Sequence, residues 1–207
     1  MKSMLKDAAI LFVITCISGA LLGLVYQVTK EPIANQQLQA KMEACKEVFE
    51  TADTFEMISE KPDLSPETLS AFVKEQGYNA DVDEVMAALD TNGEILGHVI
   101  TVTDHEGYGG DIQFSVGITK EGLLNGISIL SISETAGLGM RAEEVLKPQF
   151  ANKTVEKFSY TKTGKTSDDQ IDAISGATIT TNAVVNGVNA ALCVNSNYLN
   201  ITQSAEE

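Results

Sequence analysis

Histidine and cysteine, which supply most metal ligands in proteins, are scarce in this sequence. The two histidines, His98 and His105, have no second ligand at the spacing of an H-x-x-x-H or C-x-x-C motif. The three cysteines, Cys16, Cys45 and Cys193, are far apart and form no C-x-x-C. We therefore expect no metal site and interpret the cysteines as structural buried thiols, with a Cys45–Cys193 disulfide as the alternative.

The motifs of several enzyme classes are also missing. No G-x-S-x-G lies between a predicted strand and a predicted helix, where a Ser-His-Asp hydrolase would need it. Neither a Walker A sequence nor a G-x-G-x-x-G is present, so neither of these phosphate-binding loops holds a nucleotide. These absences argue against a hydrolase of this kind and against a dinucleotide-binding fold.

Positive charge is scarce as well. The chain of 207 residues has 14 Lys and Arg against 29 Asp and Glu, a net charge of −15. So acidic a protein repels nucleic acid, and we exclude DNA or RNA as a partner. With 43% hydrophobic residues, the chain has enough apolar side chains for a folded core.

One long segment has no charge at all. Residues 8–26 are uncharged and long enough as a helix to cross a hydrocarbon core of about 30 Å. The alternative is a cleaved signal peptide, but no small-x-small cleavage site follows before Lys30. We predict a single-span anchor. Lys2 and Lys6 on its short N-terminal side place the N-terminus in the cytoplasm and the acidic body outside.

Two further helices are predicted after the anchor. Apolar residues recur at helical spacing from Pro32 to Thr51, and proline suits the first turn of a helix. A shorter helix follows Pro66 and ends at Gly77. The rest of the segment between Ala52 and Asn79 is irregular and carries no recognisable chemistry.

Strand patterns dominate the next part of the chain. Residues 85–90 and 95–103 flank an Asn-Gly turn and predict a hairpin, and two more strands are predicted over 112–119 and 123–133. A short helix ending before Pro148 and a strand near 154–160 follow. The fold class is therefore α+β: an antiparallel meander with one covered face, and helices packed on it.

The stretch D-A-I-S-G-A-T, from Asp172 to Thr178, lies between a polar run and an apolar helical pattern that begins at Ala183. Thr180 or Thr181 is predicted to cap this helix, which leaves Thr178 as a hydroxyl just before a helix N-terminus. The amide groups and the dipole of such a terminus favour a phosphate. A capped turn without a ligand is the alternative.

Two other glycine-rich corners, G-Y-G-G and E-T-A-G-L-G, precede this stretch. With the anchor and the K-E-P-I-A of the neck, the three corners in this order resemble a known family. It is the FMN-binding domain of the G subunit of the Rnf electron-transport complex, related to the C subunit of the sodium-translocating NADH:quinone reductase. The resemblance covers nearly the whole chain. Its most specific part is the motif D-x-x-S-G-A-T.

The resemblance implies a flavin site. In the family, a flavin transferase esterifies the threonine that closes S-G-A-T to the phosphate of FMN. By position this threonine is Thr178, and the recognition sequence of the transferase is completed by Asp172, Ser175, Gly176 and Ala177. The second corner is expected to contact the isoalloxazine ring through Glu134, Thr135, Leu138 and Gly139. Tyr108 and Gly109 are further candidates for contacts to the ring, and the alternative for Tyr108 is an aromatic residue that covers the core. Lys162 or Lys165 could lie near the phosphate, with a solvated loop as the alternative.

The same resemblance implies the function and the location. We expect a membrane-anchored flavoprotein that relays electrons within a ferredoxin:NAD oxidoreductase complex that moves Na⁺ or H⁺, with integral-membrane subunits as partners. The quinone-reductase C subunit and a tethered binding or scaffold domain without cofactor are the alternatives. We expect four segments: a cytoplasmic N-terminus (residues 1–7), an anchor in the inner membrane (8–27), a helical neck with a connecting segment (28–80) and an extracytoplasmic FMN-binding domain (81–207). The core of the FMN-binding domain is expected at about 90–196.

Overall fold

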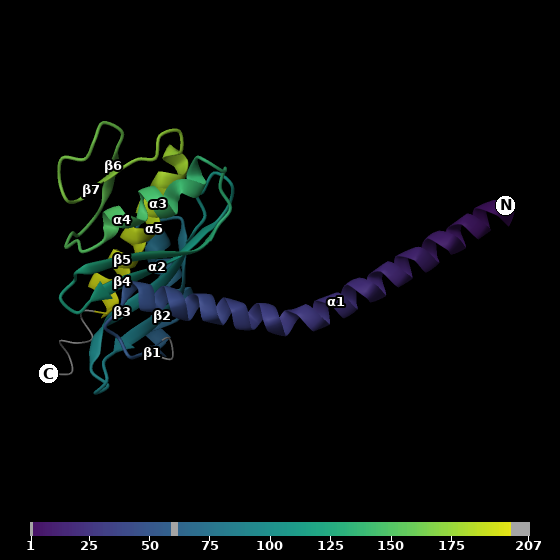
Figure 1. Ribbon diagram of the computed structural model, residues 1–207, viewed down its shortest axis with the longest axis horizontal. Helices are drawn as coiled ribbons and strands as arrows, with labels where there is room; N and C mark the ends of the chain where they lie inside the picture. Colours follow the sequence, from purple (N-terminus) through teal and green to yellow (C-terminus); the bar gives the residue numbers. More distant parts are fainter. Residues whose placement is uncertain (1, 59–61, 200–207) are drawn as a thin grey trace. The chain divides into compact units, whose positions relative to one another are not determined.

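A computed structural model describes residues 2–58 and 62–199 of the chain. By their internal contacts the residues form two units, Met1–Ala40 and Lys41–Glu207. Residues 2–40 of the first unit belong to a single helix, and every strand among the described residues lies in the second unit (Figure 1). The predicted start of the FMN-binding domain at residue 81 stays a prediction, whereas the second compact unit begins forty residues earlier, in α1.

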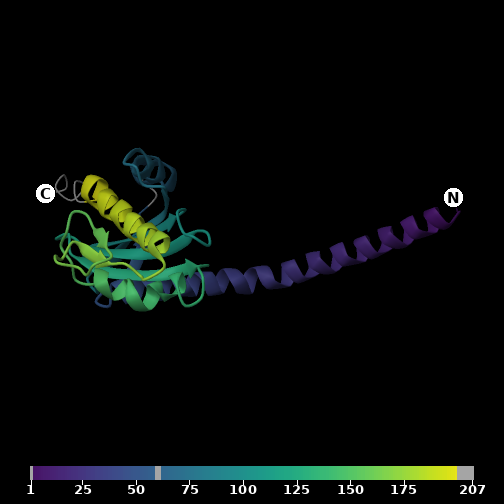
Figure 2. The same ribbon diagram turned by 90° about the horizontal axis from the view of Figure 1, so that it is seen from above.

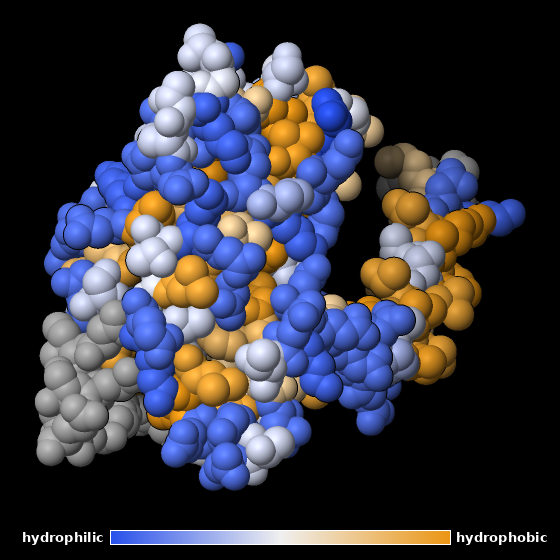
Figure 3. All heavy atoms as spheres, turned by 60° about the vertical axis from the view of Figure 1, so that its left-hand side comes forward, coloured by the Kyte–Doolittle hydropathy of each residue, from blue (hydrophilic) through white to orange (hydrophobic). Residues whose placement is uncertain are grey.

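Helix α1 runs without interruption over Lys2–Val48. The prediction of two helices, the second beginning at Pro32, is wrong, because Pro32 lies inside α1. A proline within a helix removes one backbone hydrogen bond, but strong helix formers on both sides let the helix continue. By length and composition, α1 is the one helix in residues 2–58 and 62–199 that could cross a membrane. Its N-terminal part presents apolar side chains, seen in Figure 3, at the surface: Phe12 is 68% and Leu22 73% exposed.

A five-stranded antiparallel sheet forms the centre of the second unit, with the strand order β1-β2-β3-β4-β5. Every consecutive pair is antiparallel, so the predicted meander and the α+β class are confirmed. The sequence indicates four strands, and the structure adds a short edge strand in the segment interpreted as irregular. The five strands are β1 Thr54–Met57, β2 Ala80–Leu89, β3 Ile95–Asp104, β4 Ile112–Thr119 and β5 Leu124–Ile132.

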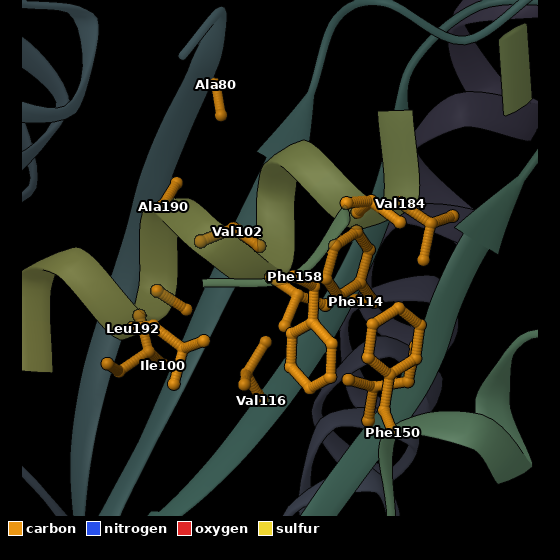
Figure 4. Packing of buried hydrophobic residues seen from close by; sticks show 14 of the residues in the cluster. Ala80, Ile100, Val102, Phe114, Val116, Phe150, Phe158, Val184, Ala190 and Leu192 are labelled. Atoms are coloured by element: carbon orange, nitrogen blue, oxygen red, sulfur yellow. The ribbon is translucent and has the colours of Figure 1, made fainter. Parts of the chain in front are cut away.

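Helix α5 (Thr178–Val194) lies across one face of the sheet, with α2 (Pro66–Glu75) beside it (Figure 2). Alternate residues of the central strands point to this face, as the pleat of a strand requires. Ile100, Val102, Phe114 and Val116 are buried there against Val184 and other residues of α5, as Figure 4 shows. This layer is the main hydrophobic core.

The opposite face is covered as well, so the prediction of one covered face is wrong. Cys45 and Val48 at the end of α1, and Phe49 directly after it, are buried in a second cluster against strand residues that include Val99. Two glycines make room for them. A Cβ atom on Gly117 would stand 2.7 Å from Cβ of Val48, and one on Gly97 would stand 2.7 Å from Cζ of Phe49. Such distances are shorter than any normal contact, so the close approach of α1 depends on glycine.

The segment after β5 is built from short pieces. As predicted, a short helix ends before Pro148, but Pro148 then lies in the first turn of a second one, a position that proline tolerates. The strand predicted near 154–160 is reduced to three residues and pairs in parallel with a strand that the sequence does not indicate. The pieces are η2 Gly139–Arg141, α3 Ala142–Val145, α4 Lys147–Phe150, β6 Ser159–Thr161 and β7 Gln170–Asp172; η1 (Pro62–Leu64) and η3 (Asn195–Leu199) lie elsewhere.

All three cysteines are free, so the Cys45–Cys193 disulfide is not formed. Cys45 is buried, Cys193 is half-buried and Cys16 is exposed on α1. His98 is buried in β3, and burial lowers its pKa to about 4. It is therefore a neutral core histidine at pH 7.

Candidate flavin site at the N-terminus of helix α5

The S-G-A-T stretch runs directly into α5. The first helical residue is Thr178 and the N-cap position is taken by Ala177, whose side chain offers no cap. The prediction that Thr180 or Thr181 caps the helix is wrong, because both lie inside its first turn with 1% and 0% exposure. Thr178 is half-buried, so it is the most exposed of the three threonines.

Thr181 has a structural role. Its Oγ1 donates a hydrogen bond to the carbonyl oxygen of Ala177 at 2.9 Å and accepts one from the N–H of Ile174 at 3.1 Å. The N–H of Ala177 also bonds to the carbonyl oxygen of Ile174, at 3.0 Å. Thr181 thus fastens both ends of the turn to the helix. The turn itself needs Gly176, which has a φ of 78°.

A cavity of about 490 Å³ opens beside this turn. It brings together three segments that are far apart in the sequence. The lining residues are Tyr108, Glu134, Thr135, Leu138, Gly139, Gly176, Ala177, Thr178, Ile179 and Thr180. Seven of the nine site residues that the sequence predicts therefore meet at one cavity, together with the weaker candidate Tyr108. Sequence reasoning missed Ile179 and the pocket position of Thr180, which follow from starting the helix at Thr178.

The second corner is a tight turn. The carbonyl oxygen of Thr135 accepts hydrogen bonds from the N–H of Leu138 at 3.1 Å and from the N–H of Met140 at 3.3 Å. Leu138 is 41% exposed at the mouth of the cavity. The Cδ2 atom of Leu138 would be 3.1 Å from a Cβ atom on Gly176, so the second and third corners touch.

Glu134 connects the second corner to the first. Its Oε1 accepts hydrogen bonds from the backbone N–H of Tyr108 at 2.7 Å and of Gly109 at 3.3 Å. Tyr108 is 70% exposed. The alternative that this aromatic residue covers the core is therefore wrong. It stands at the rim of the cavity instead.

A pair of titratable residues lies just before the first corner. Asp104 is fully buried, its Oδ1 accepts the N–H of Glu106 at 2.8 Å, and burial raises its pKa to about 7. His105 lies between two carboxylates: Nδ1 is 3.0 Å from Asp111 and Nε2 is 2.9 Å from Asp81. Hydrogen bonds to Asp111 and then Asp81 raise the pKa of His105.

Comparison with known proteins places this geometry in a family. The family model described as FMN-binding domain matches residues 107–193, a range that contains all three corners. The model of the RnfG N-terminal region matches residues 1–48 and ends on the last residue of α1. The G subunit of the Na⁺-translocating ferredoxin:NAD⁺ oxidoreductase complex of Acetobacterium woodii is 31% identical over 95% of this chain and 93% of its own length. The chain belongs to the RnfG family of ion-translocating oxidoreductase complexes.

Other members of the RnfG family match over similar lengths. The G subunit of the proton-translocating complex of Clostridium ljungdahlii is 29% identical over 86% of this chain and 85% of its own length. The G subunit of the ion-translocating complex of Methanosarcina acetivorans is 30% identical over 92% and 94%. The crystal structure of Shewanella oneidensis NqrC superposes on 61% of each chain with a TM-score of 0.47 and 17% identity.

Not every residue of the D-x-x-S-G-A-T motif lies at the cavity. Asp172 is in β7, where its Oδ1 accepts the N–H of Lys165 at 2.6 Å and its backbone pairs with the side-chain amide of Gln149. Ser175 is exposed in the turn, and neither it, Lys162 nor Lys165 lines the cavity. The carboxylate of Asp172 therefore holds the loop that precedes S-G-A-T.

The residues at the cavity fit a flavin mononucleotide. The volume lies in the range of cofactor pockets, and the walls combine apolar side chains with a few polar groups. The first amide groups of α5 have no acceptors within the helix, which suits them to a phosphate at Thr178. No lysine or arginine is among the described residues that line the cavity, so these amide groups are its source of positive potential.

Proposed function

We propose that this chain is a membrane-anchored flavoprotein subunit that relays electrons through FMN within an ion-translocating ferredoxin:NAD oxidoreductase complex. Membership of the RnfG family and the match to the FMN-binding domain support this function. Two of the relatives are named as parts of complexes that translocate Na⁺ or protons. The partners are then the other subunits of such a complex, including those embedded in the membrane.

The hydroxyl of Thr178 carries the FMN through a phosphoester bond, made by a flavin transferase that reads the sequence from Asp172 to Thr178. The observation that carries this proposal is the contrast between three neighbouring hydroxyls. Thr178 and Thr180 both line the cavity, but Thr180 and Thr181 are buried in the first turn of the helix, whereas Thr178 is half-buried. Tethering keeps the effective concentration of the flavin high at a site with few polar contacts.

The residues around the cavity position the cofactor. Amide groups at the start of α5 bind the phosphate, and Thr135, Leu138 and Gly139 contact the isoalloxazine ring. When bound, FMN supplies the one- and two-electron redox chemistry. The protein holds the ring where its edge stays accessible to donor and acceptor.

The membrane arrangement follows from α1. Lys2 and Lys6 precede the uncharged run, which favours an N-terminus in the cytoplasm and the flavin domain on the extracytoplasmic side of the inner membrane. Protease added to intact spheroplasts should then release the flavin domain. Protection in spheroplasts, with cleavage in inverted vesicles, would reverse the orientation.

The attachment is tested by expressing the full chain with and without a flavin transferase, then measuring in-gel flavin fluorescence and intact mass. Wild type should gain the mass of one phosphoester-bound FMN, and Thr178→Val should gain none. Thr180→Val is the matched control: it changes the same residue type two positions away and should still be labelled. Labelling of Thr178→Val would place the bond elsewhere, and an unlabelled wild type would favour a tethered domain without cofactor.

A further inference from the structure

Three glycines of the first two corners lie close to Glu134 or to the residue before it. A Cβ atom on Gly107 would stand 3.0 Å from Oε1 of Glu134, and one on Gly139 would stand 2.8 Å from its Oε2. A Cβ atom on Gly109 would stand 2.0 Å from the carbonyl oxygen of Ser133 and 3.3 Å from Cα of Glu134. Gly139 thus makes room for Glu134 and Gly109 for the backbone of Ser133, while Gly107 is held mainly by the carbonyl oxygen of Gly110, which a Cβ atom would approach to 2.1 Å.

The hydrogen bonds of Glu134 also connect the second corner to the first. Its Oε1 accepts the N–H of Tyr108 at 2.7 Å and of Gly109 at 3.3 Å. An oxygen of a carboxylate has about two lone-pair positions, and two donors fill them. Oε1 therefore has no acceptor capacity left for a donor on a flavin ring. The side chain is half-buried between the corners, although it also borders the cavity.

We propose that Glu134 is a positioning residue: its carboxylate fixes the Gly107–Gly110 corner so that the ring of Tyr108 forms one wall of the flavin pocket. Tyr108 is 70% exposed, and no aromatic contact to another described residue holds its ring in place. Its position therefore depends on its backbone, which Glu134 binds directly. An aromatic ring held at the rim can pack against the flat isoalloxazine.

This inference rests on the proposed flavin function only for the role of Tyr108; the contact between Glu134 and the corner is a property of the protein itself. Both parts are tested on the full chain in detergent micelles. The first test uses protein made without a flavin transferase and measures hydrogen exchange of the amide groups of Tyr108 and Gly109. The variants are Glu134→Ala, Glu134→Gln and, as a matched surface carboxylate, Glu144→Ala.

Glu134→Ala should speed exchange of both amide groups by about tenfold or more, because it removes their common acceptor. Glu134→Gln keeps a carbonyl oxygen and should stay within about threefold of wild type. Glu144→Ala should change neither. Unchanged exchange in Glu134→Ala would overturn the proposal, as would a glutamine variant as fast as the alanine one. Loss of protection throughout β4 in Glu134→Ala would also overturn it, since Glu134 would then support the whole fold.

The second test uses FMN-loaded protein and steady-state flavin fluorescence. A ring packed against the isoalloxazine quenches it, so Tyr108→Leu should raise the fluorescence. Glu134→Ala should raise it to a similar level, and the double variant should add little. Additive increases would show that Glu134 acts without Tyr108 and would overturn the positioning role. A wild type without bound FMN would contradict the proposed function, while the exchange experiment would still decide whether Glu134 holds the corner.

Discussion

Lys41 and Glu84 form an ion pair of 3.1 Å between the last turns of α1 and strand β2. The carboxylate side chain of Glu84 is only 10% exposed, whereas the side chain of Lys41 is 34% exposed. Because Glu84 is the more buried partner, its charge has little access to water and is stabilised mainly by Lys41. Because Lys41 begins the second unit, this contact helps to fix the end of α1 on the sheet.

Replacing Lys41 with methionine should destabilise the second unit by ~1–3 kcal/mol, because a buried carboxylate loses its charged partner. The midpoint of denaturant unfolding of the full chain in detergent measures this. Lys41→Met combined with Glu84→Gln should recover most of the loss. If the double variant is no more stable than Lys41→Met, the pair is not what stabilises this contact.

Thr181→Val should also destabilise the protein, for a different reason. Valine keeps the shape of threonine but removes the hydroxyl that accepts the N–H of Ile174 at 3.1 Å. That N–H would then be buried without an acceptor, at a cost of ~1–3 kcal/mol. Thermal unfolding measures the effect, and Thr181→Ser, which retains the hydroxyl, is the control. Equal midpoints for valine and wild type would show that the hydroxyl does not fasten the turn.

Much of the sheet was predictable because its strands are rich in β-branched residues, alternate apolar and polar residues in β4, and are joined by turns with glycine. Two strands were not. β1, with the sequence T-F-E-M, and β7, with Q-I-D, are short and lie at the edge of a sheet or in a two-stranded one. Their pairing with a neighbouring strand defines them, and a sequence window does not contain that neighbour.

The site was predictable to the level of its motifs but not of its geometry. The sequence singles out Thr178 and Glu134, and both line the same cavity. The predicted start of α5 is about three residues late, because threonines are good N-caps and the apolar pattern begins only at Ala183. The sequence predicts that the glycine corners make room for a ligand. In the structure, Gly139 lines the cavity and also makes room for Glu134 and for Thr180, a residue distant in sequence.

His105 should make stability depend on pH above neutrality. Its hydrogen bonds to Asp111 and Asp81 raise its folded pKa above the unfolded value of about 6.5. The stabilisation is therefore complete below about pH 6.5 and is lost as the pH rises through the folded pKa. His105→Gln should lower the thermal midpoint by a few degrees at pH 6 and much less at pH 9. A difference that is constant from pH 6 to pH 9 would show that protonation of His105 contributes nothing.

Asp104 should also make stability depend on pH, but at lower pH than His105, and its ionised form should destabilise the folded chain. Burial raises its pKa to about 7 in the folded chain, against about 3.9 when unfolded. Between these values the folded state holds a proton that the unfolded state has released, so stability falls as the pH rises from about 4 to about 7. Above pH 7 the loss is complete, because the carboxyl group is then ionised in both states. That charge destabilises the folded state because the carboxylate is fully buried and its Oδ2 has no partner among the described residues.

Asp104→Asn should therefore stabilise the protein at pH 8, by ~1–3 kcal/mol, and change little at pH 4. An amide keeps an oxygen for the N–H of Glu106, which the carboxylate accepts at 2.8 Å. Denaturant midpoints at pH 4, 6 and 8 measure the difference. Asp111→Asn is the control, because that carboxylate is 63% exposed and should not reproduce the gain at pH 8. If Asp104→Asn is equally destabilising at all three values, the pKa of Asp104 is not raised in the folded chain, and a contact that the amide cannot make stabilises the corner before Tyr108.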